Sequence, residues 1–163
     1  MRVLAGAADA AARSDAGRVM ALETELAKAA LTRLARRDPA ATDHPMPFAD
    51  LVRLSPRLAW PAYFRTVGVH NPLGTVNVAE PVFFARIDTL VDTTPMPTWR
   101  AYLRYHILAR PAPWLSSPFV REDFAYSSHF RGNTELLPPW NLCLSVTTRQ
   151  LGATLGHAYS EKT

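Results

Sequence analysis

The sequence has little of what anchors many functional sites, beginning with cysteine. Cys143 is the single cysteine among 163 residues, which excludes an internal disulfide framework and a zinc site built on several thiolates. No run of about 20 apolar residues occurs, so we expect no membrane-spanning helix. The alanine-rich start is interrupted by Asp9 and Arg13 before an apolar core can form, unlike a secretory signal. With 48% hydrophobic residues, the chain can bury a core, and we expect a single helical domain over residues 1–163.

Charge of one sign does not dominate either. The 18 basic and 14 acidic residues are interspersed and leave a net charge of +4. The densest basic cluster, Arg33, Arg36 and Arg37, is predicted to lie in the last turn of an opening helix, where cations favour the negative end of the helix dipole. A phosphate-binding patch is the alternative. No run of basic residues interleaved with aromatics follows, so we expect no nucleic-acid partner.

The common catalytic motifs are absent. The sequence contains no H-E-x-x-H, no glycine-rich phosphate loop and no G-x-S-x-G elbow. A helical zinc site needs two histidines four residues apart, because that spacing places both imidazoles on one helix face. The histidines never have this spacing; they are His44, His70, His106, His129 and His157. The sequence therefore predicts no catalytic residue and no metal ligand.

The remaining reactive residues have structural interpretations. His106 follows Tyr102 by four residues on an aromatic stripe, which favours a half-buried, hydrogen-bonded histidine over a ligand. Cys143 and His157 lie on one predicted helix, roughly 21 Å apart by the helical rise, so they cannot form a nucleophile–base pair. Cys143 is then expected to be a small packed apolar residue. The adjacent acidic residues Glu122 and Asp123 are expected to lie on a solvated face. The tryptophans are expected to be core anchors; they are Trp60, Trp99, Trp114 and Trp140.

Proline punctuates a series of helical patterns. The opening helix is expected to begin at Ser14 or Asp15 and to end at Asp38, since the residue before Pro39 is disfavoured in a helix. Its apolar stripe recurs at three- and four-residue steps and consists of Val19, Leu22, Leu26, Ala29 or Ala30, and Leu34. Later helices are expected to start near Pro47, Pro61, Pro81, Pro97, Ser117-Pro118 and Pro138-Pro139.

Little else interrupts the helices. Gly68 is a predicted helix C-terminus, followed by a loop over 68–74 and a very short strand in "TVNVAE". Gly152 and Gly156, one turn apart, are expected to let a neighbouring backbone approach closely. The predicted fold is all-α, an irregular array of six or seven helices with at most a trace of strand.

Five longer segments, in order along the chain, resemble the neprilysin-like zinc endopeptidases, the family that includes endothelin-converting enzymes and bacterial oligopeptidases. The resemblance runs from Asp15 to Lys162. The segments are "DAGRVMALETELAKAALTRLARRDP", "MPFADLVRLSPRLAWPAYF", "VNVAEPVFF", "TWRAYLRYHIL" and "LLPPWNLCLSVTTRQLGATLGHAY". The sequence departs from the family pattern at Pro139, Asn141, Leu142 and Ser160.

The resemblance implies a specific role. In that family these segments belong to the mostly helical N-terminal region, which covers the zinc-bearing catalytic domain and restricts access to a closed cavity. The zinc ligands lie in the later catalytic domain, so no catalytic or metal residue is carried over to this chain. The resemblance implies that the parent enzyme hydrolyses short peptides with zinc and acts outside the cytoplasm, as a periplasmic, secreted or membrane-anchored protein.

Three hypotheses remain open from the sequence. The first is a non-catalytic lid fragment whose partner is the missing catalytic domain, with both ends of the chain looking cut. The second is a stand-alone helical interaction module without enzymatic activity, and the third is a small enzyme with an unrecognised site. Under the first hypothesis an exposed apolar face is expected where the partner domain docks, and that face could form a dimer.

Overall fold

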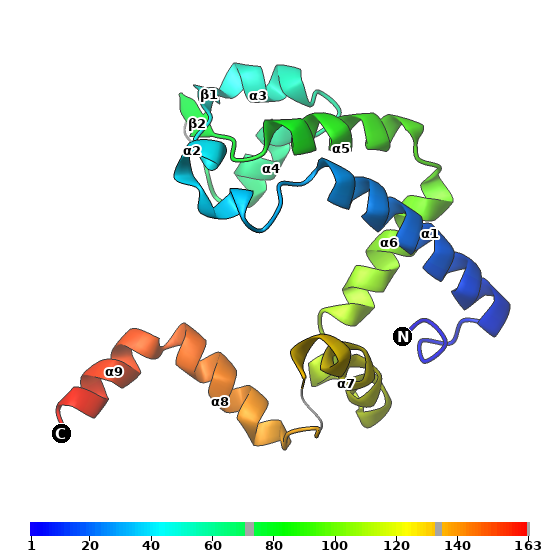
Figure 1. Cartoon of the computed structure of the whole chain (residues 1–163), viewed down its shortest axis with the longest axis vertical. Helices are drawn as coiled ribbons and strands as arrows, with labels where there is room; N and C mark the ends of the chain where they lie inside the picture. The colour runs from blue at the N-terminus through cyan, green and yellow to red at the C-terminus, as the bar shows by residue number, and fades with distance from the viewer. Residues whose placement is uncertain (71–73, 133–134, 163) are drawn as a thin grey trace. The chain divides into compact units, whose positions relative to one another are not determined.

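The computed structural model describes residues 1–70, 74–132 and 135–162. Within these ranges the chain folds into nine α-helices, two 3-10 turns and one two-stranded sheet (Figure 1). The elements are α1 Asp9–Ala29, η1 Ala35–Arg37, α2 Pro39–Thr42, β1 Pro45–Pro47, α3 Phe48–Leu54, α4 Trp60–Thr66, β2 Thr75–Asn77, α5 Pro81–Thr93, α6 Met96–Ala109, η2 Ala112–Trp114, α7 Ser117–Arg131, α8 Pro139–Gln150 and α9 Gly152–Ser160. The predicted all-α class with a trace of strand is confirmed.

Most predicted helix boundaries are confirmed as well. A proline occupies one of the first two positions of α4, α5, α7 and α8, where its missing N–H costs nothing. Gly68 follows α4 in the left-handed conformation, with φ of 86°, as a helix-terminating glycine should. The helix count exceeds the prediction because Pro39–Thr42 forms an extra turn and because the last predicted helix is divided into α8 and α9.

The opening helix both begins and ends earlier in the chain than the sequence predicted. It begins at Asp9, so neither Ser14 nor Asp15 is its cap, and it ends at Ala29. The early end has a tertiary cause: the backbone N–H of Leu31 donates to a carboxylate oxygen of Glu80 at 2.7 Å, which holds the chain out of the helical path. Arg33, Arg36 and Arg37 therefore do not lie in the last turn of α1. Leu34 was predicted to belong to the buried apolar stripe, but its side chain is exposed.

Contacts divide the chain into two compact units, Arg2–Leu108 and a second formed by Met1 with the residues from Ala109 onward. In the first unit, α5 lies between α3 and α1 (Figure 1). The buried apolar side chains of this unit come mainly from these helices: Val19, Leu22, Leu51, Val78, Leu90 and Ala101. Helix α5 contributes Leu90 to this core, and α1 contributes Val19 and Leu22.

A small two-stranded antiparallel sheet fixes the chain ahead of α5. Met46 of β1 pairs with Val76 of the predicted strand, β2, in an antiparallel register, so the predicted strand is confirmed. The following Val78 is buried, and its N–H donates to the carbonyl of His44. The predicted loop over 68–74 lies partly outside the described residues, at 71–73. This sheet ends three residues before Glu80, so it sets the position from which α5 begins at Pro81.

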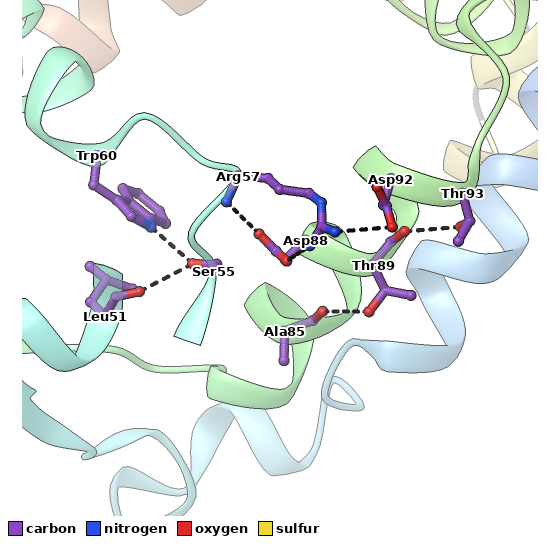
Figure 2. Close-up of polar contacts among 9 residues, drawn as sticks. All are labelled: Leu51, Ser55, Arg57, Trp60, Ala85, Asp88, Thr89, Asp92 and Thr93. Carbon is purple, nitrogen blue, oxygen red and sulfur yellow. Dashed lines mark hydrogen bonds and ion pairs between the residues drawn. The ribbon is translucent and has the colours of Figure 1, made fainter. Parts of the chain in front are cut away.

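A polar network fastens α5 to the segment between α3 and α4 (Figure 2). Asp88 of α5 accepts two hydrogen bonds from Arg57, one from its backbone N–H at 2.7 Å and one from its guanidinium at 2.8 Å. Fully buried Ser55 accepts from the Trp60 indole and donates to the carbonyl of Leu51. Because each buried polar atom in this chain of contacts has a partner, the segment is held in one conformation.

The second unit has less core. Ala112 of η2 is buried, and η2 packs against α7. Helices α8 and α9 contact each other, but neither has a buried residue among those described. The prediction that Gly152 and Gly156 admit a close backbone neighbour is wrong, since a Cβ at either position would meet nothing within 4 Å among the described residues.

We predict that Asp88→Ala lowers the free energy of unfolding by about 2 kcal/mol. The backbone N–H of Arg57 then loses its acceptor, and the guanidinium keeps only its contact with Asp92. Asp92→Ala is the matched control: Asp92 also pairs with Arg57, but its side chain is 57% exposed against 9% for Asp88. The control should cost less than about 0.5 kcal/mol. Urea denaturation followed by circular dichroism measures both, and equal effects would contradict the importance of the buried Asp88 carboxylate.

Glu25 gives the stability of the first unit an acidic limit. Hydrogen bonds from Lys28 and Arg86 lower the pKa of Glu25 below its ordinary value of 4.5, and the Arg86 contact joins α1 to α5. A lowered folded pKa means that the stabilisation is present above pH 4.5 and is lost as the pH falls through the folded pKa. Glu25→Gln should therefore destabilise the chain near neutral pH, and the difference from wild type should shrink in acid.

The control for this pH dependence is Glu135→Gln, at an exposed carboxylate. Urea midpoints are compared for the wild type and both variants across the acidic range. If the difference in urea midpoint between the wild type and Glu25→Gln stays constant with pH, the ion pairs of Glu25 do not set the acidic limit.

Candidate functional site

The titratable side chains do not converge on a catalytic centre. Among the described residues, no three His, Cys, Asp or Glu side chains are grouped so that they could hold a metal ion. Two of the histidines bind carboxylates instead: His106 contacts Glu23 and His157 contacts Glu161. His70 and His129 are exposed. The carboxyl groups of Glu122 and Asp123, the adjacent acidic pair, belong to no such group either.

His106 is the histidine with the most defined surroundings. Its Nε2 lies 2.9 Å from a carboxylate oxygen of Glu23 on α1, and its ring lies edge-on to Tyr102, with centroids 4.4 Å apart. The predicted half-buried, hydrogen-bonded histidine is confirmed. Burial, followed by the nearby charge of Glu23, raises the pKa of Tyr102 above its ordinary value. Periodicity revealed His106 and Tyr102, but no sequence signal identified Glu23, which lies 83 residues away from its partner.

Cys143 and two of the tryptophans differ from their predictions. Cys143 is exposed and not a packed apolar residue. It lies on α8 while His157 lies on α9, so the separation inferred from one continuous helix does not apply. Trp60 packs on Phe84 with ring centroids 5.2 Å apart, as a core anchor should. Trp114 and Trp140 are exposed, because the described chain provides no side chains to cover them.

The most distinctive surface of the chain is apolar. Large hydrophobic side chains are exposed on several helices: Met20, Tyr63, Val67, Val82, Met96, Leu103, Ile107, Tyr126, Phe130, Trp140, Leu144, Leu151, Leu155 and Tyr159. Soluble monomers rarely expose so much apolar surface. The candidate functional site is therefore a docking surface.

Helices α8 and α9 show this most clearly. Each has apolar residues at helical spacing, which is typical of a packed helix face. Five large apolar side chains along this segment are nevertheless exposed: Trp140, Leu144, Leu151, Leu155 and Tyr159. We call these residues the C-terminal apolar face. Such a face is stabilised only when another surface covers it.

One shallow hollow of about 210 Å³ lies between α1 and the turn from α5 to α6, lined by Ala21, Leu22, Glu25, Leu90, Thr94, Pro95 and Thr98. Its only charged side chain, Glu25, is already paired with Lys28 and Arg86. None of the helices in the described ranges combines the length and apolar character needed to cross a bilayer.

We predict that side chains of the C-terminal apolar face contribute little to the stability of the isolated chain. Leu151→Ala should change the free energy of unfolding by less than about 0.5 kcal/mol, because Leu151 is exposed. Leu22→Ala is the matched control at a buried position and should cost about 2–4 kcal/mol. If Leu151→Ala were as costly as Leu22→Ala in urea denaturation, this face would be packed within the chain and would not be a docking surface.

Comparisons with known proteins connect this surface to a family. The model of the N-terminal region of peptidase family M13 matches residues 1–163. Endothelin-converting enzyme 1 of Homo sapiens is 25% identical over 169 residues, which cover 99% of this chain and 22% of that protein. The corresponding enzyme of Bos taurus is 24% identical with the same coverage. The chain thus spans about a fifth of the length of these relatives.

Solved structures agree with the sequence comparison. The zinc metalloprotease Zmp1 of Mycobacterium tuberculosis, in its open state, superposes with a TM-score of 0.81 and 26% identity, over 91% of this chain and 23% of that one. The same protease bound to an inhibitor also gives a TM-score of 0.81, at 24% identity over 92% of this chain. The resemblance to zinc endopeptidases seen in the sequence is confirmed. The chain belongs to peptidase family M13, of which it represents the N-terminal helical region.

Proposed function

We propose that the chain is a non-catalytic helical lid of an M13 zinc peptidase and that its exposed apolar faces dock on the catalytic domain. The observation that carries this proposal is the combination of a large exposed apolar surface with the lack of a metal-binding cluster in the described residues. The parent enzyme hydrolyses peptide bonds of short peptides and acts outside the cytoplasm. The lid limits access to the active site by size.

The residues of this chain do not fit the zinc that the family implies. His106 and His157 each contact a single carboxylate, that of Glu23 and that of Glu161. Zinc requires three or four protein ligands around one point. Cys143 is a lone thiol among the described residues. We therefore assign the metal and the reacting groups to the catalytic domain, and to this chain only docking and exclusion of large substrates.

The size-limiting role is tested in the whole peptidase that contains this chain. Leu151→Ser with Leu155→Ser should weaken docking of the C-terminal apolar face and so loosen the lid. The ratio of kcat/KM for a short fluorogenic peptide to that for an unfolded protein carrying the same cleavage sequence should then fall by roughly tenfold. Thr148→Ser with Thr154→Ser, at exposed polar positions of the same helices, is the control and should leave the ratio unchanged.

The possible outcomes separate the proposal from its alternative. An unchanged ratio in a folded Leu151→Ser/Leu155→Ser enzyme would contradict a size-limiting lid. It would favour a helical interaction module without a role in substrate selection. The same C-terminal apolar face would pair two copies of the isolated chain in a dimer, which sedimentation velocity would detect and the double serine variant would abolish.

A further inference from the structure

The segment that follows α1 has a helical composition but is not an α-helix. Residues 30–38, "ALTRLARRD", contain neither glycine nor proline, and alanine, leucine and arginine are among the strongest helix formers. Helix α1 nevertheless ends at Ala29, Ala30 is extended with ψ of 147°, and only the short turn η1 forms beyond it. No residue of the segment is buried, and Leu34 is 80% exposed. The helix therefore stops without a local stop signal and without a core contact that would hold the turn.

The side chain of Glu80 supplies the missing signal. One carboxylate oxygen accepts the backbone N–H of Leu31 at 2.7 Å, and the other accepts the guanidinium of Arg36 at 2.9 Å. In a continued helix, the N–H of Leu31 would instead donate to the carbonyl of Ala27, four residues earlier. Both oxygens of Glu80 are thus bound to one segment, and one of them takes the donor that the next helical turn needs.

Glu80 is the fixed side of this contact. It lies directly ahead of α5 and two residues after Val78, which is buried and whose N–H donates to the carbonyl of His44. The Glu80 side chain itself is only 17% exposed. On the other side of the contact, residues 39–42 form the single turn α2, which has no buried residue. Residues 30–42 can therefore change conformation without loss of core packing while Glu80 stays in place.

We propose that residues 30–37 form a helix–turn switch and that the Glu80 carboxylate is its latch. With the carboxylate bound, the N–H of Leu31 is held outside α1 and the chain turns. When the carboxylate is released, this N–H bonds to Ala27 and α1 extends by about two turns, until Pro39 ends it. The helix formers of the segment favour the extended state, and the two charge-assisted hydrogen bonds of Glu80 oppose it. The switch concerns the path of the chain within the first unit, so it goes beyond the proposed docking and size-limiting roles.

A local explanation of the turn competes with this one. The hydroxyl of Thr32 accepts the N–H of Ala35 at 3.1 Å, and threonine is a common helix cap. This contact lies beyond the point at which the chain leaves α1, so it accounts for the start of η1 but not for the end of α1. The two explanations differ in their consequences. If Glu80 is the latch, Glu80→Ala extends α1, whereas Thr32→Ala leaves the turn in place.

The test uses backbone NMR of the full 163-residue chain. Glu80→Ala should move the Cα resonances of residues 31–35 to helical values and add nuclear Overhauser contacts between residues three apart. Thr32→Ala should leave these resonances at their wild-type values. Asp92→Ala is the matched control, since it removes an exposed carboxylate from α5, and it should also leave them unchanged. Unaltered amide resonances of Leu51 and Leu90, both buried, verify that the first unit is folded in each variant.

Glu80→Gln is the second variant, for use if Glu80→Ala does not fold. Glutamine keeps the side-chain length, but it offers one neutral acceptor oxygen and cannot bind Leu31 and Arg36 together. The change toward helical values should therefore be smaller than in Glu80→Ala and in the same direction. The proposal is overturned if residues 31–35 keep their wild-type resonances, or become disordered, in a folded Glu80→Ala or Glu80→Gln chain. It is also overturned if Thr32→Ala or Asp92→Ala produces the same helical change as Glu80→Ala.

Discussion

The first unit depends on how helix α5 is fixed between α1 and α3. Leu90 supplies its buried apolar contact, while Asp88 binds the backbone and guanidinium of Arg57 from a buried position. At the start of α5, Glu80 binds the N–H of Leu31 and so determines where the chain leaves α1. Arg86 then pairs with Glu25 on α1. Directional polar contacts therefore fix the position of α5, which a small apolar core would leave poorly defined.

The small core and the exposed apolar faces have one physical cause. Short helices joined by proline turns present more apolar surface than the described chain can cover by itself, and the surplus remains on α6, α8 and α9. Burial of that surplus against another surface would supply the stabilisation that the chain lacks. The chain belongs to peptidase family M13 and spans about a fifth of the length of its relatives.

Much of the fold could be predicted because its causes are local. Proline at helix starts, glycine at position 68 and the apolar steps of each helix depend on backbone geometry that each segment carries in itself. One prediction failed because a distant residue intervened: Glu80 binds the N–H of Leu31 and ends α1 ahead of Asp38. The continuous helix expected from Pro139 to Tyr159 is interrupted at Leu151. Helical periodicity identifies an apolar face but not what covers it, so Trp114 and Trp140 were expected in a core that the described chain does not form.

The sequence by itself determined the all-α class, the family resemblance and the lack of a recognisable catalytic motif, because these depend on local spacing and on residue types. Only the tertiary structure decided which helix faces are covered. It paired His106 with Glu23, buried Asp88 against Arg57, and left Met96, Leu103 and Ile107 exposed. Burial and ion pairing join residues far apart in the chain, and no local pattern specifies those partners.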